Sequence, residues 1–254
     1  MDKRAVRIGS LMLGQGQPAV CIPVMGGSLD ALALSAQRAA CACADLIELR
    51  ADSLCAMPTH EAAKAMCDAV RSAAPGIPLL FTLRTTRDGG DGADDAAAYE
   101  ALLCAVATGR WADAVDCELS VGEAAFSRIV SEAHGAGVPV VGSSHDFKKT
   151  PDEEEIVATL AAMERLRADV CKIAVMPRSR MDVLTLMRAA VRCDEELFSP
   201  VIAIAMGPFG LMTRIGGEMI GSCLTFGSAG QASAPGQIDA KSLRTTLEII
   251  HNSL

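Results

Sequence analysis

The feature that most constrains the fold is a strand-like run followed by a helix-like run, repeated along the whole chain. Each apolar, β-branched run ends in polar residues and leads into an alanine- and leucine-rich stretch of helical period. Such alternation predicts parallel strands joined by crossover helices. The expected strands are 20–25, 45–50, 78–84, 112–118, 138–145, 169–175, 200–206 and 221–226. Eight such units favour an α/β fold with one closed (β/α)8 barrel, spanning residues 1–254 as a single domain, over an open sheet.

The residues before the first of these strands predict a small addition to the barrel. Short apolar runs at 4–8 and 11–13 flank Gly9 and Ser10, a pattern typical of a hairpin or an irregular plug. Helix starts are marked at Ser28, Thr59 and Asp152, each with acidic residues in the expected first turn. Two glycine-rich segments, at 89–92 and 227–236, are expected to be long loops.

Charge and composition exclude several classes of protein. The net charge of -8 and the lack of a Lys/Arg cluster argue against nucleic-acid binding, which requires neutralised phosphates. No apolar run reaches the roughly 18 residues of a membrane span, and the charged segment 1–7 is not followed by the apolar core of a secretion signal. The ten cysteines lack Cys-x-x-Cys pairs and suitably spaced histidines, which favours reduced core residues of a cytoplasmic protein over a metal site.

Polar residues occupy strand positions whose side chains should point into the barrel. Barrel side chains alternate between the interior and the helix layer, so apolar Cys171, Ile173 and Val175 on the helix side leave Lys172 inside. The same parity sends further polar side chains inward from four other strands: Glu48, Arg50, Thr82, Arg84, Asp116, Glu118, Ser143 and His145. Most lie near carboxyl ends of strands, where barrel enzymes gather catalytic groups. A network of ion pairs that only fills the barrel is the alternative, and the contribution of five strands favours a functional site.

Lys172 and His145 are suited to imine chemistry. Burial among apolar residues and repulsion from Arg50 and Arg84 both favour the uncharged amine of Lys172, which is a nucleophile toward carbonyl groups. A protonated imine withdraws electrons and acidifies the neighbouring C–H. A histidine can remove that proton and return one to a departing hydroxyl. His145 is the candidate, because the other histidines fall on expected helices or near the carboxyl terminus.

A set of short segments spread over nearly the whole chain carries a family pattern. The segments are ELRAD at 48–52, 81–84, 88–90, 116–119, SSHDF at 143–147, CKIA at 171–174, 213–214, 217–218, 224–227 and 232–238. In this order they resemble the type I 3-dehydroquinate dehydratase family. The resemblance implies a lyase of the shikimate pathway that converts 3-dehydroquinate into 3-dehydroshikimate, needs no metal or organic cofactor, and forms a homodimer.

The resemblance also implies roles for single residues. Lys172 forms an imine with the C3 ketone, and His145, oriented by Asp88, removes a C2 proton and protonates the leaving C1 hydroxyl in a syn elimination. The implied substrate-binding residues are Glu48, Arg50, Arg84, Arg214, Ser233, Gln237, Met206 and Phe226. Of these, Arg214 matches the arginine that grips the substrate carboxylate, while Ser233 and Gln237 match a loop that closes over the substrate.

Two positions depart from the family pattern, and two other functions fit part of it. Asp88 stands where glutamate is common, and Ile204 stands where methionine is frequent. A Schiff-base class I aldolase also uses an inward lysine, but it requires a phosphate cradle after the seventh and eighth strands, where this chain has Arg214 and segment 233–237. A catalytically silent binding relative is expected to lack Lys172 or His145, and both are present.

Overall fold

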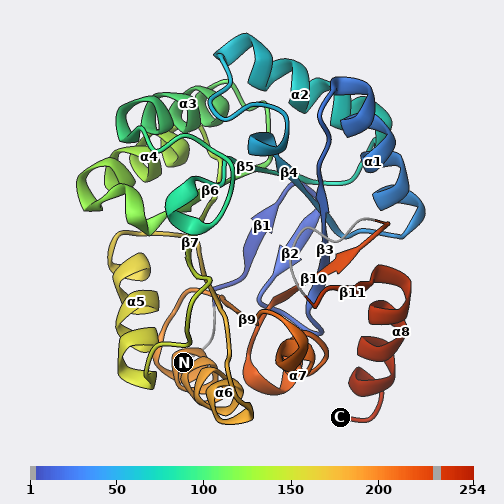
Figure 1. Ribbon diagram of the computed structural model, residues 1–254, viewed down its shortest axis with the longest axis vertical. Coiled ribbons are helices and arrows are strands. Elements are labelled where there is room, and N and C mark those ends of the chain that lie inside the picture. Colours follow the sequence, from blue (N-terminus) through green and yellow to red (C-terminus); the bar gives the residue numbers. More distant parts are fainter. Residues whose placement is uncertain (1–3, 231–235) are drawn as a thin grey trace.

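Strands and helices alternate around a closed ring in the computed structural model, which describes residues 4–230 and 236–254 (Figure 1). The barrel strands are β3 (Ala19–Val24), β4 (Leu46–Arg50), β5 (Leu79–Thr82), β6 (Ala114–Glu118), β7 (Val140–Asp146), β8 (Val170–Val175), β9 (Val201–Ala205) and β10 (Leu224–Ser228). They pair in parallel, and β11 (Ile238–Asp239) adds to β10. A bridge between Val201 and Ser222 joins β9 to the start of β10 and completes the ring. The predicted (β/α)8, or TIM, barrel is confirmed.

Helices cover the outside of this ring (Figure 1). They are α1 (Leu29–Cys41), α2 (His60–Ala73), α3 (Ala96–Thr108), α4 (Glu123–Gly135), α5 (Glu153–Arg165), α6 (Arg180–Glu196), α7 (Leu211–Ile215) and α8 (Ala240–His251). The side chains of Ser28, Thr59 and Asp152 cap three of them by accepting backbone N–H groups, as predicted. Within the described ranges, no helix combines the length and apolar character needed to cross a membrane.

The chain begins with a hairpin that fills the base of the barrel. Strands β1 (Val6–Ile8) and β2 (Leu11–Leu13) pair antiparallel around Gly9, whose φ of +57° suits a tight turn, and Figure 1 shows them inside the ring. Val6, Ile8 and Leu13 are buried against interior residues such as Leu46 at the amino end of β4. The predicted hairpin is confirmed, and it acts as an apolar plug.

The core has two layers, and their membership confirms the predicted direction of side chains. Residues Cys171, Ile173 and Val175 pack between strands and helices, in the outer layer. Val170 and Ala174, which flank Lys172 at alternate positions, belong to the inner cluster together with the hairpin. The apolar base of the barrel therefore leaves the carboxyl ends of the strands for polar residues.

Some strand ends differ from the prediction. Strand β10 begins at Leu224 rather than residue 221, because Gly221 has a φ of +72° and ends the turn η5 (Gly217–Ile220). The same strand continues through Gly227 and Ser228, which were expected to lie in a loop. Strand β5 stops at Thr82, since the chain then folds back and the Arg84 carbonyl accepts a hydrogen bond from the N–H of Gly92.

Candidate active site

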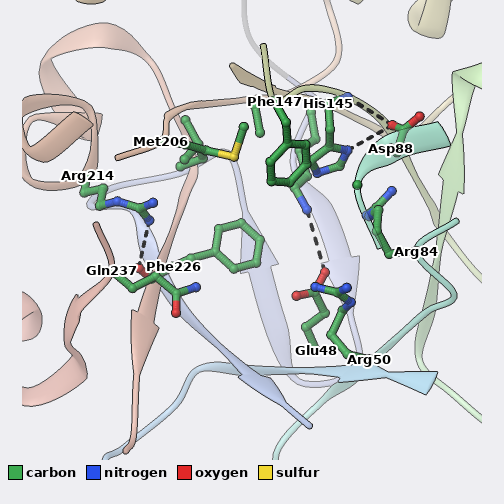
Figure 2. Close-up of a pocket in the computed structure, with 14 residues that line it drawn as sticks. Glu48, Arg50, Arg84, Asp88, His145, Phe147, Met206, Arg214, Phe226 and Gln237 are labelled. Atoms are coloured by element: carbon green, nitrogen blue, oxygen red, sulfur yellow. Dashed lines mark hydrogen bonds and ion pairs between the residues drawn. The ribbon is translucent and has the colours of Figure 1, made fainter. Parts of the chain in front are cut away.

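A cavity of about 100 Å³ lies at the carboxyl ends of the barrel strands (Figure 2). The lining residues are Glu48, Arg50, Arg84, Asp88, Gly89, His145, Phe147, Lys172, Ala174, Ile204, Met206, Arg214, Phe226 and Gln237. They include every residue assigned to the site from the sequence except Ser233, which lies outside the described residues. Residues from six strands and their following loops therefore meet in one place.

Lys172 projects from β8 into this cavity and is only 4% exposed. Its Nζ lies 3.7 Å from Oε1 of Glu48 and 3.7 Å from Oδ2 of Asp116. The nitrogen also sits 4.5 Å from the centre of the Phe226 ring, a cation–π contact. The charges nearest to the amine are thus negative. The expectation based on burial and on repulsion from Arg50 and Arg84 was incomplete, because it left out these two carboxylates.

His145, on β7, is held by Asp88 (Figure 2). Its Nδ1 is 3.1 Å from Oδ2 of Asp88, and its backbone N–H donates to the same oxygen at 3.0 Å. Because a carboxylate only accepts hydrogen bonds, Nδ1 carries the ring proton and Nε2 keeps its lone pair. The shorter side chain of Asp88 therefore still reaches the imidazole, from the single turn η2 (Thr86–Asp88).

The surroundings of His145 favour its neutral form. Burial, reinforced by the positive charges of Arg84 and Lys172, lowers the pKa of His145 well below its usual value, although Asp116 acts in the opposite direction. A neutral imidazole with an oriented lone pair is a proton acceptor at physiological pH. This is the protonation state that a general base requires.

Phe147 in the cavity lining and Asp52 behind it received no role from the sequence. The ring of Phe147 stacks beside that of His145, with centroids 6.4 Å apart and an interplanar angle of 20°. Asp52 is buried and accepts two hydrogen bonds from Arg50, at 2.9 Å from Nε and 2.6 Å from Nη2, so it fixes the guanidinium at the cavity wall. Each lies two positions beyond an assigned residue, and that spacing is a signal that could have pointed to them.

A buried ionic network lies beneath the cavity. Nη1 of Arg84 lies 3.0 Å from Glu118 and donates to Ser143 at 2.9 Å, while Nη2 lies 2.8 Å from Asp116. Burial opposes the charge, but the carboxylates of Asp116 and Glu118 outweigh it and raise the pKa of Arg84 well above its usual value. Tyr99 adds a further support, since its hydroxyl accepts the backbone N–H of Glu118 at 2.9 Å.

Removal of the cation from this network should strongly destabilise the fold. Arg84→Ala leaves two buried carboxylates without their shared partner, and we expect the free energy of unfolding in urea to fall by about 3–5 kcal/mol. Arg128→Ala is the matched control, because Arg128 pairs with Glu100 at the surface and such pairs contribute little to stability. Equal stability of the two variants would contradict the prediction.

Arg214, on α7, is a further cationic side chain in the wall of the cavity. Its side chain is almost fully buried, and Nη1 donates to the carbonyl of Phe226 at 3.3 Å. Burial lowers the pKa of Arg214 to about 10, so the guanidinium remains a cation at neutral pH. Figure 2 shows it across the cavity from Glu48 and Arg50, with Gln237 nearby. A planar carboxylate of a small ligand matches this guanidinium.

Comparison with known proteins connects this geometry to one family. A family model described as Type I 3-dehydroquinase matches residues 20–254. The 3-dehydroquinate dehydratase of Listeria innocua is 40% identical over 252 residues, which cover 99% of both chains. The enzyme of the same name from Klebsiella pneumoniae is 39% identical over 247 residues, covering 97% of this chain and 98% of the relative.

A solved structure agrees with these sequence relatives. The type I 3-dehydroquinate dehydratase of Clostridium difficile, crystallised with covalently modified comenic acid, superposes with a TM-score of 0.95. The two sequences are 37% identical, and the match covers 99% of this chain and 100% of the other. The similarity therefore includes the whole barrel rather than a local motif.

Proposed function

Because this chain belongs to the type I 3-dehydroquinase family, we propose that it dehydrates 3-dehydroquinate to 3-dehydroshikimate, in the shikimate pathway, through an imine on Lys172. The observation that carries the proposal is the placement of the buried Lys172, the oriented His145 and the buried Arg214 around one cavity. Residues 1–254 act in this proposal as a single catalytic domain.

Substrate binding uses charges on opposite walls of the cavity. Arg214 binds the carboxylate of 3-dehydroquinate with its planar guanidinium. Glu48, Arg50 and Arg84 bind hydroxyl groups and orient the ring, while Met206 and Phe226 form apolar walls. Gln237 lines the cavity and contacts the bound substrate, and Ser233, which lies outside the described residues, is assigned to substrate binding by the family resemblance alone. These contacts place the C3 ketone next to Nζ of Lys172.

The reaction then needs one nucleophile and one acid/base. The ammonium group of Lys172 gives up one proton, and the free amine attacks the C3 carbonyl. The released proton returns to the carbinolamine oxygen, so that water leaves and a protonated imine forms. Nε2 of His145 removes a proton from C2, and the imine nitrogen takes up the electron pair as an enamine. The histidine returns the proton to the C1 hydroxyl as the C–O bond breaks, which gives a net syn loss of water. Hydrolysis of the new imine releases 3-dehydroshikimate and restores Lys172.

Reductive trapping tests this proposal directly. Incubation of the protein with 3-dehydroquinate and borohydride should leave a stable secondary amine on Lys172, which mass spectrometry of peptides can locate. Omission of either reagent is the control. The proposal fails if the protein turns over the substrate and no adduct appears, or if the adduct lies on another lysine.

The lowered pKa of His145 sets the pH dependence of the reaction. A general base is active when deprotonated, and a lower pKa keeps it deprotonated to lower pH. The acidic limb of the kcat/KM profile should therefore lie below about 6.5, the ordinary value for histidine. Steady-state rates measured between pH 4 and 8 in buffers of constant ionic strength check this. An acidic limb at or above the ordinary value would contradict the expected effect of burial.

We also propose that the protein is a homodimer that works in the cytoplasm. Exposed apolar side chains on α6, η4 (Pro208–Gly210), α7 and η5 support a subunit interface: Met181, Leu184, Phe209, Leu211, Met212 and Met219. The exposed thiols of Cys41, Cys43 and Cys55 suit a reducing compartment. Light scattering should give a mass of twice 26.4 kDa, and a monomer at micromolar concentration would contradict the dimer.

The two rival functions are less consistent with the site. A class I aldolase also needs an inward lysine, but it requires a phosphate cradle. This chain has the buried Arg214 in that region, and its guanidinium suits a carboxylate. A silent binding relative has no need for an imidazole whose lone pair is oriented by a carboxylate. Family membership favours the dehydratase over both.

A further inference from the structure

We propose that Asp116 is a positioning residue that acts as the counter-ion of the Lys172 nitrogen throughout the reaction, from beneath the floor of the cavity. The inference rests on the proposed imine at Lys172 and adds a residue that acts through that lysine. It gives a function to a carboxylate that does not line the cavity itself.

The carboxylate of Asp116 is held in place through one oxygen, and its other oxygen faces Lys172. Asp116 is 1% exposed, and its Oδ1 accepts a hydrogen bond from Oγ of Ser143 at 2.6 Å and lies 2.8 Å from Nη2 of Arg84. Its Oδ2 has no hydrogen-bond partner within residues 4–230 and 236–254 and lies 3.7 Å from Nζ of Lys172. A buried, unsatisfied carboxylate oxygen is costly, so its placement beside a reacting nitrogen calls for a function.

Glu48 is the other carboxylate beside Nζ, and its position differs in one respect. Its Oε1 lies equally close, at 3.7 Å, but Glu48 lines the cavity and can be engaged by the substrate. The hydroxyl of Thr82 also donates to that oxygen, at 3.1 Å. When Glu48 binds a substrate hydroxyl, Asp116 remains as the fixed negative charge for the nitrogen.

The nitrogen of Lys172 is positively charged at several stages of imine formation, and each of these stages requires a nearby negative charge. An ammonium group and a ketone give an iminium ion and one water molecule: two N–H protons leave with the carbonyl oxygen, and the positive charge stays on nitrogen. Burial by itself raises the pKa of Asp116, but Arg84, Lys172 and His145 together lower it, so the carboxylate is ionised at neutral pH. A fixed anion in a water-poor site stabilises the iminium without reorganisation.

Four charged or titratable groups surround the nitrogen, and the test must separate Asp116 from the others. They are Cys21 from β3, Glu48 from β4, Asp116 from β6 and His145 from β7, while Arg84 pairs with Asp116 behind them. Removal of a neighbouring negative charge makes a cation lose its proton at lower pH. The iminium in an Asp116→Asn variant should therefore deprotonate at lower pH. A purely structural role would lower the yield of folded enzyme without this shift.

The experiment measures iminium formation in a His145→Ala parent, so that the imidazole cannot contribute to the pH dependence. Cyanoborohydride reduces the protonated imine, and the yield of Lys172 adduct with 3-dehydroquinate is measured against pH. Asp116→Asn in this parent should lower the alkaline midpoint of the yield by about one pH unit or more. Glu118→Gln is the matched control, because Glu118 is equally buried on the same strand but contacts Arg84 and Thr85 rather than Lys172. Its midpoint should stay within a few tenths of the parent value.

Each outcome decides the matter. An unchanged midpoint in a folded Asp116→Asn protein, checked by circular dichroism, overturns the inference, while restoration of the midpoint by Asp116→Glu supports it. If the Asn variant does not fold, Ser143→Ala removes one of the two contacts that hold Oδ1 and should shift the midpoint by a smaller amount, and no change there also overturns the inference. Absence of any Lys172 adduct in the parent and in the unmodified protein overturns the proposed function as well, so the two failures are distinguishable.

Discussion

Replacement of Lys172 by alanine is expected to abolish turnover of 3-dehydroquinate. The amine is the nucleophile, and loss of a covalent nucleophile lowers kcat on the order of 10⁶-fold in enzymes whose catalytic groups act as a unit. Borohydride trapping should also fail, since Lys172 is the only lysine among the residues that line the described cavity. Progress curves recorded at the absorbance of 3-dehydroshikimate check the loss of turnover, and peptide mass spectrometry checks the loss of the adduct.

Lys241→Ala provides the matched control for this variant. Lys241 is exposed on α8, away from the cavity lining, and its replacement should leave rate and adduct unchanged. Substantial activity in Lys172→Ala, with an intact fold, would show that the dehydration proceeds without an imine.

Replacement of His145 by alanine is expected to separate imine formation from elimination. General acid/base groups contribute about 10²–10⁴-fold, so kcat should fall by that factor. The adduct on Lys172 should still form, because nucleophilic attack requires the lysine and not the imidazole. Rate measurements and trapping on the same preparation give both numbers.

His60→Ala is the control for the histidine variant. His60 begins α2 and packs edge-on against Trp111, with centroids 6.4 Å apart, so its loss should leave catalysis unchanged. Loss of the adduct in His145→Ala, at normal stability, would assign the histidine to imine formation rather than to proton transfer at C2.

Much of the barrel and of the site could be predicted because both depend on local sequence patterns. Strand parity alone placed Lys172 in the interior, since the apolar neighbours Cys171 and Ile173 had to face the helices. The same rule brought His145 and Arg84 to the same end of the barrel. Capping residues such as Asp152 marked helix starts through a short-range hydrogen bond that is visible in the sequence.

The remaining features depend on contacts between distant residues. Parity showed that Asp116 faces inward, but not that its Oδ2 approaches Nζ of Lys172 two strands away. Whether Asp88 could reach His145 depended on the single turn η2, whose position the sequence does not specify. The start of β10 was wrong because the left-handed conformation of Gly221 follows from the preceding turn.

The apolar hairpin in the base of the barrel determines how molecules move through a reaction cycle. Each turnover releases one water molecule when the imine forms and one in the elimination, and it consumes one when the imine is hydrolysed. With β1 and β2 packed into the amino end, these molecules leave at the carboxyl ends of the strands, on the same side as the substrate and the product. The exchange of water on that side of the barrel is therefore coupled to the departure of the product.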